Sequence, residues 1–416
     1  MTKFPLVRLE EVAEVRLGRQ RAPKNHRGDH MRPYLRAANI GWSGLKLDDV
    51  KHMNFTDSEL VVYRLAPGDL LLSEASGSPG EVGKPALWSG EIEDCAFQNT
   101  LLRVRSREHE PRFLLHYFQL VALSGRFVPE ARGVGINHLG RARLAGWMTP
   151  TPGRREQRRI VEILEDHLSR LDVAAGSLAE ARTRSESMLI SHLSSVVRRH
   201  RHGGLPSARI GELANTALGK MLDSKRTTGE PIPYLANINV RWGHFDLEAL
   251  KRVPLTDDEQ GRLQLEPGDV VACEGGEPGR CAVWELPDSG IAFQKALHRI
   301  RVKDRNRITP DFLALMIREA IQSGRADRLF TGSTIKHLPQ EKLRQIEIPM
   351  PSMSEQAAVV ALASEIVNSA ARLNEEISAI SRRGQQLRRA VLATAFEGKL
   401  TGRHTDAEMI EELTDV

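Results

Sequence analysis

The sequence RLEEVA at residues 8–13 returns as RIGELA at residues 209–214, and further echoes follow along the chain. The run PYL at 33–35, followed by Asn39-Ile40, returns as PYL at 233–235, followed by Asn237-Ile238. Four more matches keep the same order, namely PGD at 67–69 and 267–269, AFQ at 96–98 and 292–294, I-x-HL at 136–139 and 335–338, and EQ at 156–157 and 355–356. A period of roughly 200 residues far exceeds the unit of a solenoid, so the sequence predicts two whole domains, each with its own appendage.

The composition is that of a soluble globular protein with room for two cores, because 40% of the 416 residues are hydrophobic and 27% are charged. No apolar run approaches the ~20 residues of a membrane span, and residues 1–5 lead into charged sequence, so we expect a cytoplasmic protein without a membrane partner. The cysteines Cys95, Cys273 and Cys281 lack paired ligand spacing. We therefore expect reduced, buried thiols and no disulfide framework or structural zinc site.

The charge is uneven, although the net charge is only +5. Between residues 16 and 36 a single acid, Asp29, stands among many cations, and glycine and proline favour a loop there. These cations are Arg16, Arg19, Arg21, Lys24, Arg27, Arg32 and Arg36. One interpretation is a solvated basic loop. The other is a loop that grips phosphate, since each neutralised phosphate releases counterions and strengthens binding at low salt.

Each half opens with about 150 residues of strand-rich sequence and closes with a long helix. The runs LLL at 70–72 and VVA at 270–272 follow Pro-Gly-Asp turns and predict strands. The runs LRVR at 102–105 and RIRV at 299–302 alternate apolar and basic residues, which predicts half-buried strands with arginines on the face away from the core. Proline-rich segments at 149–152 and 348–351 then separate each domain from its helix.

Heptad spacing of apolar residues predicts coiled-coil helices after both proline-rich segments. Ser352 and Glu355 have the spacing of a capping box at the start of the second helix. The first seam contains Val161, Leu164, Leu168, Leu171, Ala175, Leu178, Leu189 and Val196, and the second contains Ala363, Ile366, Ala370, Leu373, Ile377, Ile380, Leu387 and Val391. Because the first helix leaves domain one and the second must return, paired seams would be antiparallel. The alternative is that each helix packs on its own domain.

The predicted fold class is α+β, a tandem repeat of two strand-rich mixed α/β domains, each followed by a long helix, with the two helices pairing as an antiparallel coiled coil. The predicted division is a first domain at 1–152, a first spacer helix at 153–203, a second domain at 204–351, a second spacer helix at 352–400 and a loosely ordered tail at 401–416. Helices of forty-odd residues would be on the order of 60 Å long.

The sequence contains no convincing catalytic motif. Residues 76–84 superficially look like a phosphate loop, but five residues separate Gly77 from Gly83 where four are required, and Pro85 follows Lys84. A metal-dependent nuclease needs clustered carboxylates beside a lysine, and the nearest run has Phe293 where the second carboxylate should stand. We therefore predict no catalytic residues, no metal site and no cofactor.

In its repeated architecture the chain resembles the specificity subunits of type I restriction-modification systems. The resemblance runs from Pro5 to about Leu400. Its most specific pieces are TPTP at 149–152 with EQRRI at 156–160, IPMP at 348–351 with EQ at 355–356, and LRRAVL at 387–392 continuing to FEGKL at 396–400.

The resemblance implies a non-catalytic DNA-binding subunit with two target recognition domains. Each domain would read one half of a split site in double-stranded DNA, and the helical pair would fix the gap between the halves. It further implies two DNA adenine methyltransferase (modification) subunits docked on the helices, with restriction translocase subunits as further partners. S-adenosylmethionine and ATP would then belong to those partners. Physically, two joined domains multiply a discrimination of about 1–3 kcal/mol per base pair and also impose a spacing.

Residues for DNA contact are chosen by chemistry, since arginine, lysine and asparagine supply donors for bases and phosphates. The candidates are Arg19, Arg21, Lys24, Trp42, Lys84, Asn137 and His138 in the first domain, and Lys220, Lys225, Arg226, Arg241, Trp242, Arg280, Lys295 and Lys336 in the second. Trp42 and Trp242 have core packing as their alternative, and Trp88 and Trp284 are expected in the core. The rival functions are a coiled-coil protein-binding adaptor without DNA specificity and an enzyme with one cleft per repeat.

Overall fold

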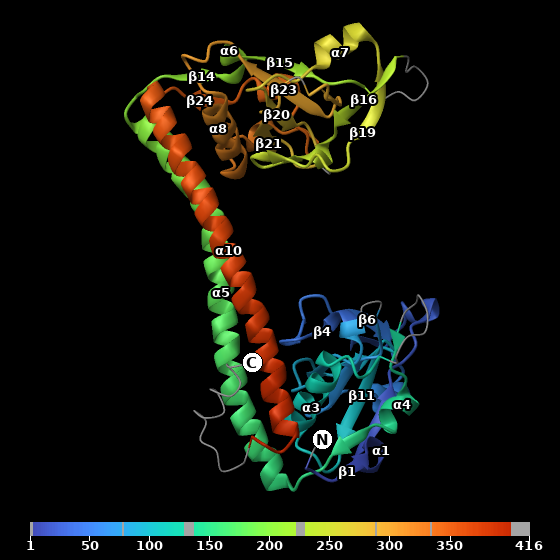
Figure 1. The fold of residues 1–416 in the computed structure, drawn as a ribbon. Coiled ribbons are helices and arrows are strands. Elements are labelled where there is room, and N and C mark those ends of the chain that lie inside the picture. Colours follow the sequence, from blue (N-terminus) through green and yellow to red (C-terminus); the bar gives the residue numbers. More distant parts are fainter. Residues whose placement is uncertain are drawn as a thin grey trace. The chain divides into compact units, whose positions relative to one another are not determined.

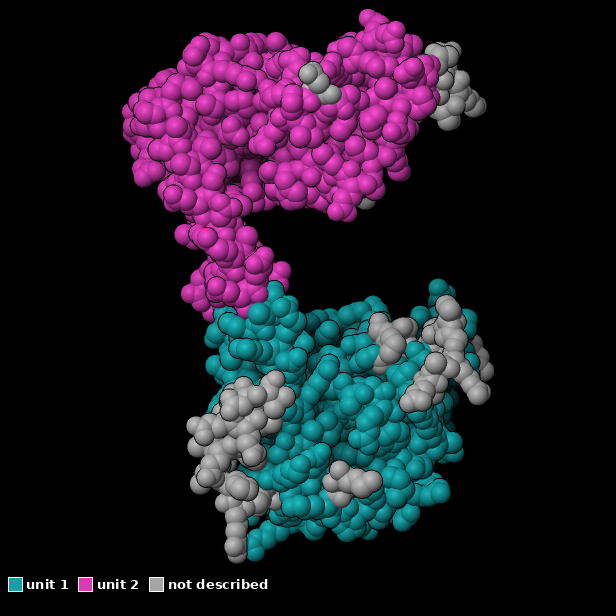
Figure 2. Space-filling model, in the orientation of Figure 1, with its two compact units in different colours: residues 1–178, 378–416 teal, residues 179–377 magenta. Residues whose placement is uncertain are grey.

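The computed structural model describes residues 3–76, 79–128, 137–221, 229–287, 289–332 and 335–400 (Figure 1). Its chain forms two compact units, coloured separately in Figure 2: residues 1–178 with 378–416, and residues 179–377. Each unit therefore contains one strand-rich domain together with parts of both long helices. No helix in the described ranges is long and apolar enough to cross a membrane.

The domain of the first unit is built on a four-stranded antiparallel sheet in the order β2-β11-β7-β9 and a three-stranded sheet in the order β10-β3-β6. Strand β1 pairs with β13 and so closes the domain beside its exit to the helix. The elements are β1 Leu6–Arg8, α1 Leu9–Val12, β2 Ala13–Leu17, η1 Pro23–Asn25, β3 Met31–Leu35, η2 Ala37–Asn39, β4 Ile40–Gly41, β5 Gly44–Leu45, β6 Lys51–Asn54, α2 Asp57–Tyr63, β7 Leu70–Ser73, β8 Ala75–Ser76, η3 Pro79–Glu81, β9 Pro85–Leu87, β10 Ala96–Phe97, β11 Leu101–Ser106, α3 Pro111–Leu123, β12 Asn137–His138, α4 Arg141–Ala145 and β13 Met148–Pro150.

The domain of the second unit repeats this topology. Its sheets have the orders β15-β23-β20-β21 and β19-β16-β22, and β14 pairs with β24. The elements are β14 Ser207–Arg209, α6 Ile210–Leu213, β15 Ala214–Leu218, β16 Glu230–Leu235, η4 Asn237–Asn239, β17 Val240–Arg241, β18 His244–Phe245, β19 Lys251–Leu255, α7 Asp257–Leu263, β20 Val270–Cys273, β21 Cys281–Val283, β22 Ala292–Phe293, β23 Leu297–Val302, α8 Pro310–Gln322, η5 Asp327–Leu329, α9 Gln340–Leu343 and β24 Glu347–Pro349. The predicted duplication of a mixed domain is confirmed.

One sequence match was out of register. Asn39 corresponds to Asn239 and not to Asn237, because both buried side chains hold the same turn. Their Oδ1 atoms accept hydrogen bonds from the backbone amides of Arg36 and Ala236 at 3.1 and 2.9 Å. Their Nδ2 groups donate to the carbonyl groups of Lys46 and Asp246. The adjacent Asn-Ile pair at 237–238 drew the sequence comparison two residues away from the structural equivalent.

The sequence predicts that Arg103 on strand β11 points away from the core, but this prediction is wrong because its side chain is only 2% exposed. Its guanidinium donates to the carbonyl groups of Val62 and Arg64 and meets the Glu14 carboxylate at 3.3 Å. The end of α2 and the chain after it thus cover this face. Two strand positions further on, Arg105 pairs with the buried carboxylate of Asp69 at 2.6 Å, so both arginines of this strand serve the fold.

The long helices are α5, Arg154–His202, and α10, Met353–Phe396. The predicted capping box is present, since the Ser352 amide donates to Glu355 Oε2 at 2.8 Å and the Glu355 amide donates to Ser352 Oγ at 3.4 Å. In the first unit, the early part of α5 shares a core with the end of α10, and in the second unit the late part of α5 shares one with the start of α10. The helices are therefore antiparallel, as predicted. The shared residues are Val161, Leu164 and Leu168 with Val391, Leu392 and Phe396, and Leu189, Leu193 and Val197 with Ala363 and Ile366.

The heptad seams are buried mainly where a domain also packs on them. In the first unit, the rings of Phe113 and Tyr117 on α3 lie 5.2 and 5.3 Å from that of Phe396. By contrast, the predicted seam residues Ala175, Leu373 and Ile380 are exposed. Two helices alone leave the flanks of a seam open to solvent, and nothing else in the described part of the chain buries these three side chains.

All three cysteines are buried and unpaired, as the sequence predicts. Burial raises the pKa of the Cys95 thiol to about 12, and that of Cys281 likewise to about 12. Trp88 and Trp284 are each 1% exposed and lie in the core, which confirms their predicted place.

Candidate nucleic-acid interface

In the first domain, Trp42 and Lys84 meet at the carboxylate of Glu81. The indole N–H of Trp42 donates to Glu81 Oε1 at 3.0 Å, and Lys84 Nζ forms an ion pair with Glu81 Oε2. The same ammonium group lies 6.0 Å from the centroid of the Trp42 ring. Burial disfavours ionisation of Glu81, but the hydrogen bonds from Lys84 and Trp42 outweigh it and lower its pKa. The two predicted residues thus form one rigid tryptophan–carboxylate–cation cluster.

The second domain repeats this cluster with an arginine. The indole N–H of Trp242 donates to Glu277 Oε1 at 2.7 Å, and Arg280 Nη1 donates to Glu277 Oε2 at 2.6 Å. Arg280 also donates from Nη2 to the carbonyl of Asn237, while the guanidinium of Arg318 lies 5.3 Å from the centroid of the Trp242 ring. Each domain therefore has a carboxylate-bound cation near a half-buried indole at the same position of the fold, with Lys84 buried and Arg280 half-buried.

The segment that contains Asn137 and His138 lies against the loop that leads to the first cluster. Asn137 pairs with Ser76, and His138 pairs with Ala75. The exposed imidazole of His138 has Nδ1 at 3.0 Å from Glu74 Oε2. The repeat places His337 opposite Gly275 in the same way, and Lys336 extends from the neighbouring position with its ammonium group 5.5 Å from the Phe330 ring. In the first domain, Trp42, Asn137 and His138 thus each contact described residues of the segment that leads to Lys84.

Arg19 and Lys220 form a second group with the capping boxes of α2 and α7. Arg19 Nη2 lies 2.6 Å from the Glu59 carboxylate, and Lys220 forms an ion pair with Glu259. The preceding residue is glycine in both copies because the chain passes very close to the neighbouring strand end. A Cβ atom on Gly18 would lie 2.2 Å from the Gln98 carbonyl oxygen. Both cations are therefore held in place by structural carboxylates.

The remaining predicted residues lie more openly. Arg21 is exposed and donates to His26 Nε2 at 2.9 Å, and Arg241 lies 3.8 Å from the Asp246 carboxylate. Lys295 is exposed, and its backbone amide donates to the Lys220 carbonyl. Lys24 belongs to η1, while Lys225 and Arg226 fall outside the described residues. The assignment of these residues to DNA contact therefore remains a prediction.

Sequence reasoning missed the carboxylates that hold these cations. Glu81 and Glu277 each stand three residues before their cation, and Glu59 and Glu259 each stand three residues after a capping threonine. Both spacings recur in the repeat, so the duplication carried a signal for them. Among the described residues, no three histidine, cysteine or acidic side chains gather in a way that could hold a metal ion.

A buried glutamine joins each domain to its long helix. Gln356 is fully buried; its Oε1 accepts from the Thr309 amide at 3.1 Å, and its Nε2 donates to the carbonyl groups of Arg307 and Pro351. Gln157 repeats the arrangement by accepting from the Glu110 amide at 2.8 Å and donating to Pro152. The repeated Glu-Gln motif therefore contains the residue that fixes the first turn of each helix to its domain.

We expect Gln356→Leu to lower the free energy of unfolding by about 2–4 kcal/mol, because leucine leaves buried backbone groups without partners. Urea denaturation measures this loss, and hydrogen exchange should speed up at the start of α10. Gln386→Leu, on an exposed position of the same helix, is the matched control and should change stability by less than about 0.5 kcal/mol. Equal stabilities of the two variants would contradict the stabilising role of Gln356 between the domain and α10.

The second domain contains a fully buried histidine, His298, whose protonation is expected to destabilise the fold. His298 lies within hydrogen-bonding distance of the Leu338 carbonyl, with 2.8 Å between Nε2 and the oxygen, and burial lowers its pKa below the ordinary 6.5. The unfolded chain binds a proton near pH 6.5 and the folded chain does so only at lower pH, so protonation favours unfolding.

We therefore expect the free energy of unfolding to fall as the pH drops below about 6.5, with His298 contributing up to about 1.4 kcal/mol per pH unit. Chemical denaturation at a series of pH values measures the slope. His298→Gln retains a donor for the Leu338 carbonyl and should flatten this slope. An unchanged slope in that variant would assign the acid sensitivity to other groups.

Comparisons with known proteins agree with this architecture. A family model described as "Type I restriction modification DNA specificity domain" matches residues 207–380. The specificity subunit of the type I restriction enzyme StySPI from Salmonella potsdam is 22% identical over 397 residues, which cover 91% of this chain and 84% of the relative. The EcoKI specificity subunit from Escherichia coli strain K12 is 22% identical over 411 residues, with the same coverage of both chains.

Two solved structures share the fold. A chain from a study of complex assembly and conformational transition of the type I restriction-modification system superposes with a TM-score of 0.68 at 18% identity. It covers 96% of the present chain and 100% of its own length. The HsdS subunit from Thermoanaerobacter tengcongensis superposes with a TM-score of 0.50 at 19% identity, covering 95% and 97%.

Proposed function

Because the chain belongs to the family of type I restriction-modification specificity subunits, we propose that each of its two domains reads one half of a split DNA site and that the paired helices set the gap between the halves. A specificity subunit is the non-catalytic component that determines the DNA site of the methylation and restriction complex. The observation that carries the proposal is the duplicated topology, with each domain joined to a long helix through a buried glutamine.

The chain is part of a type I restriction-modification assembly. In this proposal, two DNA adenine methyltransferase subunits dock on the helices, and restriction translocase subunits join them. Those subunits supply the cofactor chemistry. The exposed apolar side chains of Leu373 and Ile380 support docking on the helices, since a two-helix seam leaves them without cover.

DNA contact is proposed at both groups of cations in each domain. The exposed Arg21, Lys295 and Lys336 suit phosphate, because their charges meet little local compensation. Lys84 and Arg280 suit a fixed role beside a DNA groove, because Glu81 binds Lys84, and Glu277 and the Asn237 carbonyl bind Arg280. The two proposed roles, phosphate contact and groove contact, differ because the first cations are exposed and the second are bound to carboxylates.

The helical spacer gives a direct test. Asp172 on α5 forms an ion pair with Arg388 on α10. Because the helices are antiparallel, Gly176, four residues after Asp172, lies at the same level as Gly384, four residues before Arg388. A Cβ atom at either glycine would meet no neighbour within 4 Å, so the space beside both glycines is open.

We expect that inserting four helical residues after Gly176 and four after Gly384 lengthens the recognised gap by about two base pairs, because the insertion adds about 6 Å of helix. Sequencing of methylated sites measures the gap and both half-sites. The half-sites should stay unchanged. Altered half-sites with an unaltered gap would contradict a spacer role.

For phosphate contact, we expect Lys295→Ala to weaken binding to all DNA sequences alike and to reduce the slope of log affinity against log salt by about 0.9. Fluorescence anisotropy on specific and random duplexes, from low to moderate salt, measures both quantities. Lys303→Ala is the matched control, because the Lys303 ammonium group donates to the backbone carbonyls of Gly211 and Glu212. A change of preferred sequence with an unaltered salt slope would exclude the phosphate role of Lys295.

A further inference from the structure

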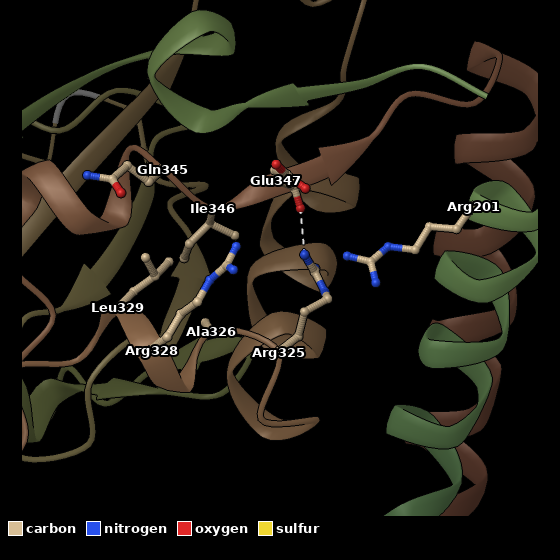
Figure 3. A pocket seen from close by; sticks show the side chains of 8 residues that line it. All are labelled: Arg201, Arg325, Ala326, Arg328, Leu329, Gln345, Ile346 and Glu347. Atoms are coloured by element: carbon tan, nitrogen blue, oxygen red, sulfur yellow. Dashed lines mark hydrogen bonds between the residues drawn. The ribbon is translucent and has the colours of Figure 1, made fainter. Parts of the chain in front are cut away.

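The second unit contains an arginine-lined pocket of about 240 Å³ that the DNA-reading account does not use. Three structural segments build it: the last turn of α5, the chain around η5, and the segment that leads into β24. Figure 3 shows Arg201 extending from α5 toward the guanidinium of Arg325, with Arg328 on the domain side. The lining residues are Arg201, Arg325, Ala326, Arg328, Leu329, Gln345, Ile346 and Glu347.

Only one of the three arginines is neutralised by a structural partner. Arg325 binds the buried Glu319 carboxylate through Nε at 2.9 Å and Nη2 at 2.7 Å, and its Nη1 donates to the Glu347 carbonyl at 2.8 Å. Within the described part of the chain, the side chains of Arg201 and Arg328 have neither an ion pair nor a hydrogen bond. The single acid of the lining, Glu347, forms no ion pair either. The pocket thus holds two uncompensated guanidinium groups against one carboxylate.

In the first unit, aromatic side chains occupy two of the matching positions. Phe127 and Trp147 stand where the repeat has Ala326 and Ile346, and their ring centroids are 4.8 Å apart. The hydroxyl of Tyr117 donates to the Met148 carbonyl at 2.8 Å. In the second domain, Arg325 donates to the carbonyl of Glu347, the residue that matches Met148. At these positions the second domain thus has smaller side chains beside an Arg325–Glu319 ion pair, where the first has two aromatic rings.

We propose that this pocket binds a phosphoryl group, either free inorganic phosphate or the phosphate end of a nucleotide. Guanidinium groups match phosphate because their planar donor forks form paired, charge-assisted hydrogen bonds. The Glu319 carboxylate and the Glu347 carbonyl fix Arg325, so one fork is oriented before the ligand arrives. A bound phosphoryl group bridges Arg201 on α5 to Arg328 on the domain and so strengthens the joint between the helix and the domain in the second unit.

Isothermal titration of the full-length protein without DNA tests this site, with inorganic phosphate as the ligand and sodium chloride to hold the ionic strength constant. The Arg201→Ala/Arg328→Ala double variant should bind phosphate at least tenfold more weakly. Arg198→Ala removes an exposed charge from the same helix outside the lining and should retain the parental affinity. Glu347→Gln removes the one opposing charge and should bind more tightly.

A second titration with ATP separates the two sources. Tighter binding of ATP than of phosphate, lost in the same double variant, assigns the pocket to a nucleotide, whereas equal affinities assign it to free phosphate. Because both mutated arginines are exposed, the circular dichroism spectrum and the thermal midpoint in chloride should match the parent. The proposal is overturned by the absence of saturable phosphate binding, or by equal affinity in the parent and the double variant.

Discussion

The structure depends on a buried side-chain amide at the start of each long helix. Gln157 and Gln356 satisfy backbone groups of the domain from inside the first helical turn, and a buried amide has little freedom to satisfy them in any other orientation. A helix that began one residue earlier or later would leave these groups unpaired. The joint therefore couples the direction of each helix to its own domain, which a spacer must do if it is to define a distance.

A second regularity concerns the cations. Many arginines and lysines that a sequence reader would assign to DNA are bound to carboxylates of their own domain, as Lys84 is to Glu81 and Arg19 to Glu59. Such pairs reduce the long-range attraction of each cation, but they hold its donors in a fixed orientation. Orientation is what base reading requires, whereas exposed cations such as Lys295 suit the phosphates, where position matters less. The same division operates in the arginine pocket, where Glu319 orients Arg325 and leaves Arg201 and Arg328 uncompensated.

The sequence predicted the duplication, the antiparallel helices, the capping box at Ser352 and the buried Trp88 and Trp284, because periodicity and repetition are properties of the chain itself. It failed where a neighbour decides the outcome. Arg103 is buried because the chain after α2 covers its strand face, whereas Ile380 is exposed on the flank of a seam between two helices. Carboxylate partners of the candidate site were equally hidden, since Trp42 and Glu81 are 39 residues apart and only the fold brings them together.

We propose that two domains on one helical spacer specify a split DNA site. The most direct test expresses this chain together with an adenine methyltransferase encoded beside its gene, in a host that lacks adenine methylation, and maps modified adenines across the genome by single-molecule sequencing. We expect a motif of two short specific halves separated by a fixed unspecified gap, present only when this chain is expressed. A soluble complex that leaves the genome unmethylated, or that methylates one continuous motif, would contradict it.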